Sequence, residues 1–328
     1  MSSYECVCCR STNFIKRGRK LNYDIYLCIN CEFEFVYPLP SFSEIKNYYN
    51  KNRKQSNTAY LITQAIDDLE NNPNSPKRDW FDRVLNYSKL ICQKDKLDII
   101  EIGSGYGYFI HYANSSGHRA SGIEISEEYA NLSNSLIKGK ILNIQSQMYG
   151  KYFSKEKFDL IYMEHVFEHF LNPSIELKRL NSLLNQDGIF FISVPNHKSL
   201  LARMFGLKWP WVHPPYHLFH FNVKAFKELF SNNNLEIVDC WTGDYFFRSI
   251  YQFYSIDIIV HLFKIVINKL LKTNFRGISY PYKYPKSLFD RLFLLPYWLL
   301  LPIIRWSNKH NMGSELIIIA RKKEKAND

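Results

Sequence analysis

Short apolar runs alternate with polar or helix-like stretches through the middle of the chain. The first run, at residues 97–102, ends in an acid and is followed by glycine at three alternate positions. Residues 108–114 then have the pattern of a short helix, which Gly117 closes, and a second apolar run occupies residues 120–125. The pattern predicts a strand, a tight turn, a helix and a second strand.

Further apolar runs continue this alternation towards the C-terminus. They predict strands at residues 140–144, 158–162, 235–240 and 315–323. Residues 163–173 read as a helical stretch, and a turn at Asp187 and Gly188 opens one more strand. Strands that alternate with helices in this way are typical of an α/β, Rossmann-like fold.

The glycines of the first turn suit a bound ligand. Gly103, Gly105 and Gly107 keep side chains away from the strand end and allow backbone conformations that other residues avoid. Glu124 ends the second strand, and an acid at this point of a βαβ unit binds the hydroxyls of a ribose. Tyr108 stands where a dinucleotide-binding turn needs glycine, which disfavours a pyrophosphate.

The pattern E-x-G-x-G-x-G, which begins at Glu101, resembles motif I of the class I S-adenosylmethionine-dependent methyltransferases. The resemblance implies a seven-stranded core in which Glu101 faces the methionine end of the cofactor and Glu124 the ribose hydroxyls. The cofactor-binding residues that it implies are Glu101, Gly103, Ser104, Gly105, Gly107, Glu124, Ile125 and Glu164. The alternative is a glycine turn in another kind of α/β protein.

The stretch after the fourth predicted strand carries a second resemblance. Its E-H pair, N-P turn and P-N ending resemble the ubiquinone O-methyltransferase branch of the class I family, whose E-x-x-E-H can hold magnesium. Here His165 replaces the first acid, with Glu164 one place earlier, which weakens a site for a hard metal ion. On a helix, His165, Glu168 and His169 would share one face. We favour the interpretation that Glu168 and His169 brace the helix beside the cofactor.

Histidines and aromatic residues are concentrated after the fifth strand. Loops beyond the carboxyl ends of strands build the site of an open α/β sheet, so this loop is expected to cover the methyl group. A P-P-x-H-L pattern resembles the family, and His217 is the histidine that matches it. A histidine suits removal of a proton from an oxygen acceptor. We therefore predict His217 as the general base, with His220 or His169 as alternatives.

Near the N-terminus, two C-x-x-C pairs predict a zinc ribbon. Cys6 and Cys9 are separated by 18 residues from Cys28 and Cys31, and the intervening residues read as a hairpin around a turn at 17–20. Four thiolates would close the coordination sphere, so this zinc would stabilise a fold and not perform chemistry. Disulfide and redox alternatives are disfavoured by the absence of a secretory or thioredoxin-like pattern. The neighbouring thiol of Cys8 could replace one ligand.

Composition and charge limit the partners. The chain of 328 residues is 46% hydrophobic and carries a formal net charge of +11, of which residues 244–328 hold much, with 14 basic and 6 acidic residues. No secretory leader and no apolar run of membrane-spanning length are apparent, so we expect a cytoplasmic protein. Residues 1–40 carry a net charge of only +1, which argues against a nucleic-acid partner on electrostatic grounds.

A long apolar insertion separates the last two predicted strands, at residues 244–313. Within residues 250–306, broad apolar faces, the tryptophans Trp298 and Trp306 and the basic excess are typical of a helical surface at the inner membrane face. The alternative is a cap that packs on the core or on a second subunit of a homodimer.

The predicted domains are a zinc ribbon at residues 1–40, a helical connector at 41–95 and a class I methyltransferase domain at 96–328. Similar cysteine-rich leaders precede methyltransferase cores in bacterial enzymes of sugar and polysaccharide modification. This resemblance implies O-methylation of a saccharide, a lipid-linked glycan or another small molecule, with S-adenosylmethionine and structural Zn²⁺ as cofactors. The alternatives are an RNA methyltransferase that uses the ribbon to bind its substrate and a non-catalytic scaffold that retains the fold.

Overall fold

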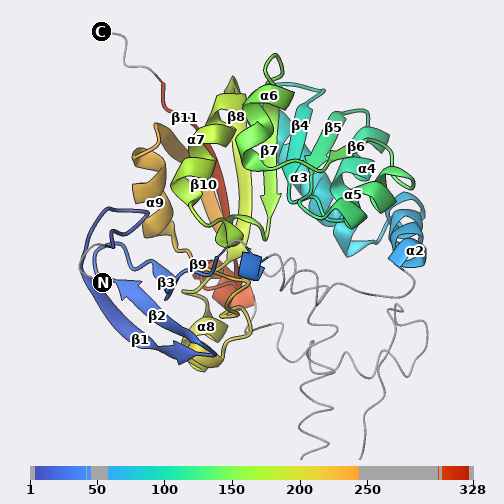
Figure 1. The fold of residues 1–328 in the computed structure, drawn as a ribbon. Helices are drawn as coiled ribbons and strands as arrows, with labels where there is room; N and C mark the ends of the chain where they lie inside the picture. The colour runs from blue at the N-terminus through green and yellow to red at the C-terminus, as the bar shows by residue number, and fades with distance from the viewer. Residues whose placement is uncertain (1–3, 42, 46–57, 244–301, 303–304, 325–328) are drawn as a thin grey trace, which may run out of the picture.

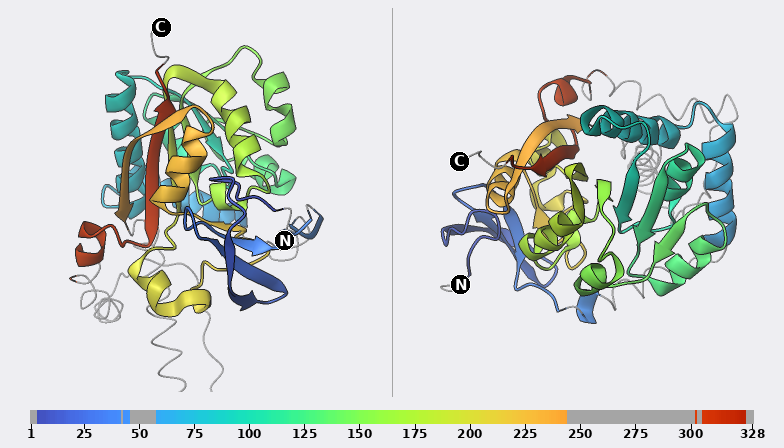
Figure 2. Two further views of the ribbon diagram at one scale, coloured as in Figure 1. Left: turned by 90° about the vertical axis from the view of Figure 1, so that its left-hand side faces the viewer. Right: turned by 90° about the horizontal axis from the view of Figure 1, so that it is seen from above.

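The computed structural model describes residues 4–41, 43–45, 58–243, 302 and 305–324. These residues form two sheets, a seven-stranded one with strand order β10-β11-β8-β7-β4-β5-β6 and a four-stranded one with order β1-β2-β3-β9. Helices cover both faces of the larger sheet, as Figures 1 and 2 show. This arrangement confirms the predicted seven-stranded, Rossmann-like α/β core.

The larger sheet is mixed, because β11 runs antiparallel between β8 and β10. Its strands are β4 (Asp98–Ile102), β5 (Arg119–Ile123), β6 (Lys140–Leu142), β7 (Phe158–Glu164), β8 (Leu184–Pro195), β10 (Leu235–Gly243) and β11 (Glu315–Lys322). The α-helices are α2 (Thr58–Asn71), α3 (Pro76–Cys92), α4 (Tyr108–Ser115), α5 (Glu127–Asn134), α6 (Tyr149–Tyr152), α7 (Pro173–Leu183), α8 (Leu200–Phe205) and α9 (Val223–Ser231). The 3-10 turns are η1 (Ser146–Met148), η2 (Phe167–His169) and η3 (Gly206–Lys208).

The central strands contribute side chains to two hydrophobic clusters, one on each face. In β7, Leu160 and Tyr162 join the cluster that contains Trp80 of α3. Ile161 and Met163 of the same strand join the other cluster, which contains residues of α7, α9 and the small sheet. Because both faces are covered, this strand is a continuous apolar run and not an alternating one.

The N-terminal segment shares a sheet with the core. Its strands β1 (Phe14–Lys20), β2 (Tyr23–Cys28) and β3 (Glu34–Tyr37) are joined by β9 (Phe219–His220), which follows β8 by more than twenty residues. The pairing places Glu34 opposite His220 and Phe35 opposite Phe219. Phe33 is fully buried, with its ring 5.3 Å from that of Phe219. The segment therefore packs as part of the main core (Figure 1).

The predicted helix at residues 163–173 is wrong. Strand β7 continues to Glu164, a single 3-10 turn follows, and α7 begins only at Pro173. His165 adopts a left-handed φ of 52°, which a helix does not accommodate. The side chain of Asn172 accepts a hydrogen bond from the backbone N–H of Ile175, so α7 begins with a separate N-cap.

Two predicted turns also differ from the structure. Asp187 and Gly188 lie within strand β8, where the pairing with β7 shifts in register between Leu184 and Ile189. A Cβ at Gly188 would lie 2.8 Å from the carbonyl oxygen of Phe158, so glycine serves the close approach of two strands. In the hairpin, residues 17–20 belong to β1, and the turn begins at Leu21.

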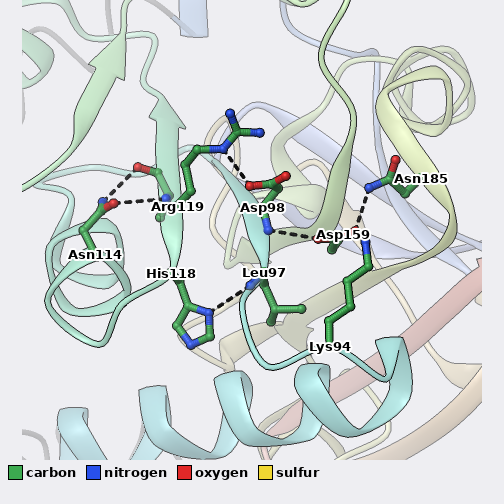
Figure 3. Close-up of polar contacts among 9 residues, drawn as sticks. Lys94, Leu97, Asp98, Asn114, His118, Arg119, Asp159 and Asn185 are labelled. Atoms are coloured by element: carbon green, nitrogen blue, oxygen red, sulfur yellow. Dashed lines mark hydrogen bonds and ion pairs between the residues drawn. The ribbon is translucent and has the colours of Figure 1, made fainter.

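The amino ends of the central strands are fixed by a buried carboxylate. Asp159 accepts hydrogen bonds from the backbone N–H of Asp98 at 3.0 Å, from Lys94 Nζ at 2.6 Å and from Asn185 Nδ2 at 2.6 Å. The three partners come from β4, the segment before it and β8, as Figure 3 shows. This edge of the sheet is thus held by saturated polar contacts, and ligand chemistry is left to the opposite edge.

The predicted helical connector contains α2 and α3 in its described part. The predicted insertion and its candidate membrane surface lie almost wholly outside the described residues. Among the residues that the structure describes, no helix is long and apolar enough to cross a membrane.

Candidate functional site

The glycine turn after β4 has the backbone conformation that its sequence predicted. Gly105 has a φ of +53°, and a Cβ added there would meet open space. Gly103 has a φ of +69°, and a Cβ there would lie 2.5 Å from Val166 Cγ2. Gly105 is therefore required for its backbone conformation alone, whereas Gly103 is required for both its backbone conformation and close packing.

Glu124 is fixed beside this turn by backbone donors. Its Oε2 accepts from the N–H of Gly105 at 2.9 Å and its Oε1 from that of Ser126 at 2.8 Å. Asn143 Nδ2 donates to the carbonyl oxygens of Glu124 and Ile125, both at 2.9 Å, and so ties the end of β6 to the same place. Because each carboxylate oxygen has a second lone pair, the fixed carboxylate can still accept hydrogen bonds from two ligand hydroxyls.

Glu101 lies at the end of β4 in a different environment. Its side chain is buried, and Oε2 has no hydrogen-bond partner among the described residues. Burial, with Glu164 and Glu124 nearby, raises the pKa of Glu101 well above its usual value, although Lys77 opposes the shift. A buried acceptor without a donor fits a ligand that brings a cationic or N–H group. This environment suits the ammonium of the cofactor that the sequence implied.

Lys77 is a residue that sequence analysis did not single out. Its Nζ lies 4.1 Å from the centre of the Tyr108 ring, at the helix that follows the glycine turn. Burial lowers the pKa of Lys77, while Glu164, Asp68 and Glu101 oppose that shift. Ser75 and the proline after it are a sequence signal for the start of α3. The sequence does not show that this helix approaches the glycine turn, because that contact depends on tertiary packing.

The cysteines of the N-terminal segment come together at one point. One ligand atom from each of Cys6, Cys9, Cys28 and Cys31 lies within 4.8 Å of the others. The Sγ atoms of Cys6 and Cys31, and those of Cys9 and Cys28, are 3.5 Å apart. Thiolates about 2.3 Å from a tetrahedral zinc ion stand about 3.8 Å from one another, so the set fits this ion. Burial raises the pKa of the Cys8 thiol well above its usual value, which suits an apolar filler.

This cysteine cluster is connected to the segment after β8. Asn222, the N-cap of α9, donates from Nδ2 to the carbonyl oxygen of Cys31 at 3.1 Å and to that of Glu32 at 2.7 Å. The same Nδ2 lies 3.1 Å from Nε2 of His197, the second residue after β8. Asn222 therefore links the backbone of the cysteine cluster to the segment at the carboxyl end of the sheet.

A cluster of histidines and acids lies beyond the carboxyl end of β7. His165 Nδ1 is 3.6 Å from Glu168 Oε1, and the His165 ring stacks on Trp211 at 5.1 Å between centroids. Burial alone would lower the pKa of His165, but Glu168 and Glu315 outweigh it and raise that pKa. Burial would likewise raise the pKa of Glu168, but His169 and His165 lower it. The two groups therefore stabilise each other as an ion pair.

The three candidate catalytic histidines belong to this cluster but differ in their contacts. Both ring nitrogens of His169 face backbone carbonyl oxygens, Nδ1 that of Tyr216 at 2.7 Å and Nε2 that of His165 at 2.9 Å. His217 and His220 are buried, and burial lowers the pKa of each, for His220 to about 4. Neither His217 Nδ1 nor either ring nitrogen of His220 has a partner among the described residues. His169 thus has the contacts of a bracing residue, whereas His217 and His220 keep ring nitrogens that are unpartnered within the described residues, and burial favours the neutral form of both.

Glu168, His169 and His217 also place ligand atoms within 4.8 Å of one another, so they could hold a metal ion. The set differs from the predicted helix face, because the third member comes from the loop before β9 and not from the H-x-x-E-H stretch. Two contacts of His169 with carbonyl oxygens favour the bracing interpretation, since a metal ion would have to displace one of them.

Comparison with known proteins adds a family match. A family model described as "Methyltransferase domain" matches residues 69–239. No curated protein sequence matches the chain significantly. Among solved structures, the plantazolicin methyltransferase BpumL in complex with SAH is 17% identical, with 86% of this chain and 100% of that chain covered and a TM-score of 0.44. A SAM-dependent methyltransferase from Archaeoglobus fulgidus is 14% identical, with 86% and 100% covered and a TM-score of 0.44.

Proposed function

The chain belongs to the methyltransferase domain family, and from this premise we propose that it methylates an oxygen atom of a saccharide that is free, nucleotide-linked or lipid-linked. It is an S-adenosylmethionine-dependent methyltransferase. When bound, the cofactor supplies an electrophilic methyl group. In our proposal, Glu124 binds the ribose hydroxyls, Glu101 the ammonium group and the exposed Ile125 the adenine side. Gly103, Ser104, Gly105, Gly107 and Glu164 complete that site.

The observation that carries the acceptor proposal is the pair of buried neutral histidines. An oxygen acceptor must lose its proton as its bond to the methyl group forms, and the chain must also align that oxygen for in-line attack. His217 offers an unpartnered Nδ1 beside the aromatic rings of Trp211 and Tyr216, at 5.2 and 5.1 Å between centroids. Burial lowers the pKa of His217 and so favours its neutral, proton-accepting form.

We also propose that the cysteine cluster holds a structural zinc ion. Four sulfur ligands leave no open coordination position, so the ion would support the fold without chemistry. Asn222 donates to the carbonyl oxygens of Cys31 and Glu32 and is also the N-cap of α9, the helix that follows the histidines. A zinc ion that fixes the cysteine segment would therefore also fix the start of this helix.

An RNA substrate is less well supported. The basic residues of the hairpin are paired with acids: Lys16 with Asp24 at 2.7 Å and Arg17 with Glu34 at 3.2 Å. These pairs neutralise much of the positive charge that the hairpin could offer to an extended phosphate backbone. The proposed contact of residues 250–306 with the inner membrane face concerns almost entirely residues outside the described part.

The test is methyl transfer from labelled S-adenosylmethionine to a panel of saccharides, with His217→Ala compared to wild type. Loss of the base is expected to lower kcat by roughly a hundredfold or more and to leave SAH affinity within about threefold. The matched control is His213→Ala, an exposed histidine of the same loop, which is expected to keep its activity. Wild-type rates in His217→Ala would remove it as the base, and no labelled saccharide would remove the acceptor class.

A further inference from the structure

A cavity of about 180 Å³ lies where the small sheet meets the segment after β8. On one side it is lined by Arg17, Leu27 and Glu34, one residue from each of β1, β2 and β3. On the other side it is lined by residues of α8, η3 and the loop that follows. A water molecule occupies ~30 Å³ in the liquid, so the cavity has room for a group of several heavy atoms, such as a phosphate.

The charged residues that line this cavity are mostly basic. Arg17, Lys198 and Arg203 line it together with a single acid, Glu34. Arg17 pairs with Glu34 and Lys198 with Glu32, which is not part of the lining. Arg203 donates from Nε to the carbonyl oxygen of Lys198 at 3.1 Å and forms no ion pair with a residue that the structure describes. Its terminal nitrogens are thus available for a bidentate contact with an anion.

A buried tryptophan supplies a different kind of contact. Trp209 lines the cavity, is 1% exposed, and its Nε1–H has no hydrogen-bond acceptor among the described residues. A buried donor without an acceptor is costly, and an oxygen of a ligand in the cavity would satisfy it. The cations and this donor together favour a ligand that has both a phosphate and further oxygen acceptors, as a sugar does.

The cavity lies next to His220, one of the histidines that we propose as alternatives for the base. Glu34 stands opposite His220 where β3 pairs with β9, so the two side chains lie on the same face of the small sheet. His197, which also lines the cavity, lies close enough to His220 for a proton on one ring to disfavour a proton on the other. A ligand anchored among the cations would therefore extend towards the histidine cluster.

We propose that this cavity binds the phosphate of a phosphorylated saccharide and so orients the saccharide for methylation, an inference that rests on the proposed saccharide acceptor. Arg203 and Lys198 contact the phosphate, and the indole N–H of Trp209 donates to a phosphate or sugar oxygen. The same chemistry is found in a nucleoside diphosphate sugar and in a polyprenyl diphosphate sugar. The site therefore recognises the phosphate, and the lipid or nucleoside lies outside it.

The first arm of the test is calorimetry on the zinc-loaded full chain saturated with SAH. Glucose, glucose 1-phosphate and uridine diphosphate glucose serve as soluble probes, and a polyprenyl diphosphate sugar in phosphatidylcholine vesicles serves as the lipid probe. At least one phosphorylated probe is expected to bind roughly tenfold or more tightly than glucose. The probe that binds best identifies the source of the phosphate.

The second arm is a charge-matched pair of double variants. Lys198→Gln with Arg203→Gln is expected to weaken phosphorylated probes by roughly tenfold to a hundredfold and to leave glucose and SAH unaffected. Lys151→Gln with Lys155→Gln removes two exposed cations before the amino end of β7 and is expected to change nothing. Trp209→Phe keeps the apolar face, removes the donor and is expected to cost roughly threefold to tenfold.

Several results would overturn the inference. Equal binding of glucose and its phosphates, or an unchanged affinity in the cavity variant, would show that the cavity does not read phosphate. An equal loss in both double variants would indicate non-specific electrostatic attraction. In each case methylation of unphosphorylated saccharides would leave the proposed function intact. If no saccharide of any kind binds or is methylated while SAH still binds, the proposed acceptor class itself fails.

Discussion

The proposed cofactor half and the proposed acceptor half of this site differ in how far apart their residues lie in the sequence. The cofactor half is built from two neighbouring strand ends, and both carboxylate oxygens of Glu124 accept backbone hydrogen bonds. The acceptor half is built from the N-terminal sheet, η2 and the loop before β9, and it buries ring nitrogens of His217 and His220 without partners.

The proposed cofactor half can therefore form from local contacts, whereas the proposed acceptor half depends on contacts between segments that are far apart in the sequence. The glycine turn and Glu124, whose carboxylate it binds, lie within one βαβ unit, against which Val166 also packs. The histidines are placed by β9, which pairs with β3, and by Asn222, which binds the carbonyl oxygens of the cysteine segment. Damage to the N-terminal segment should therefore affect acceptor chemistry far more than cofactor binding.

The largest effect is expected from loss of the proposed zinc site. Cys28→Ser should abolish zinc binding and lower methyl transfer by roughly a hundredfold or more, because structural zinc contributes on the order of 10 kcal/mol to folding of its segment. SAH affinity should change by less than about threefold. Zinc content by atomic absorption, the transfer rate and calorimetry measure the three quantities.

The control for this variant is Cys240→Ser, a half-buried cysteine of β10 far from the cluster in sequence. It should keep zinc and activity. A parallel loss of SAH binding in Cys28→Ser would show that the two halves are not independent, and full activity without zinc would show that the ribbon does not support the acceptor half.

Acid should destabilise the acceptor half through its buried neutral histidines. The unfolded chain protonates His220 near pH 6.5, whereas burial holds its pKa at about 4 in the folded protein. Stability from this group is therefore complete above about pH 6.5 and is lost as the pH falls towards 4, by about 3 kcal/mol. Urea unfolding of wild type and His220→Asn between pH 7 and 4.5 measures it. The variant should show the smaller slope, and equal slopes would contradict a neutral buried His220.

In the cofactor half, Glu124→Ala should weaken SAH binding by roughly thirtyfold to a hundredfold. The change removes the acceptor for the ribose hydroxyls and leaves the N–H groups of Gly105 and Ser126 without their partner. Calorimetry measures the affinity. Glu127→Ala, an exposed acid at the start of the next helix, is the matched control and should bind SAH normally. An unchanged affinity in the first variant would exclude the ribose role.

The sequence predicted correctly those features that depend on contacts between residues close together in the chain. The glycine turn, Glu124 at the tip of β5 and the strand order along the chain all follow from residues close together in the sequence. The predicted helix at 163–173 was wrong because His165 takes a left-handed conformation that its ion pair and its stacking on Trp211 accommodate. The pairing of β3 with β9 joins segments about 185 residues apart, and no local pattern indicates it.

The most direct test of the cofactor assignment is calorimetric titration of the zinc-loaded chain with SAH in two buffers of different ionisation enthalpy. We predict one SAH per chain and release of a proton, because the ligand's ammonium stabilises the Glu101 carboxylate, whose pKa burial raises. Affinity should accordingly fall as the pH is lowered. No binding, or binding that is indifferent to pH and to Glu124→Ala, would contradict the cofactor site described here.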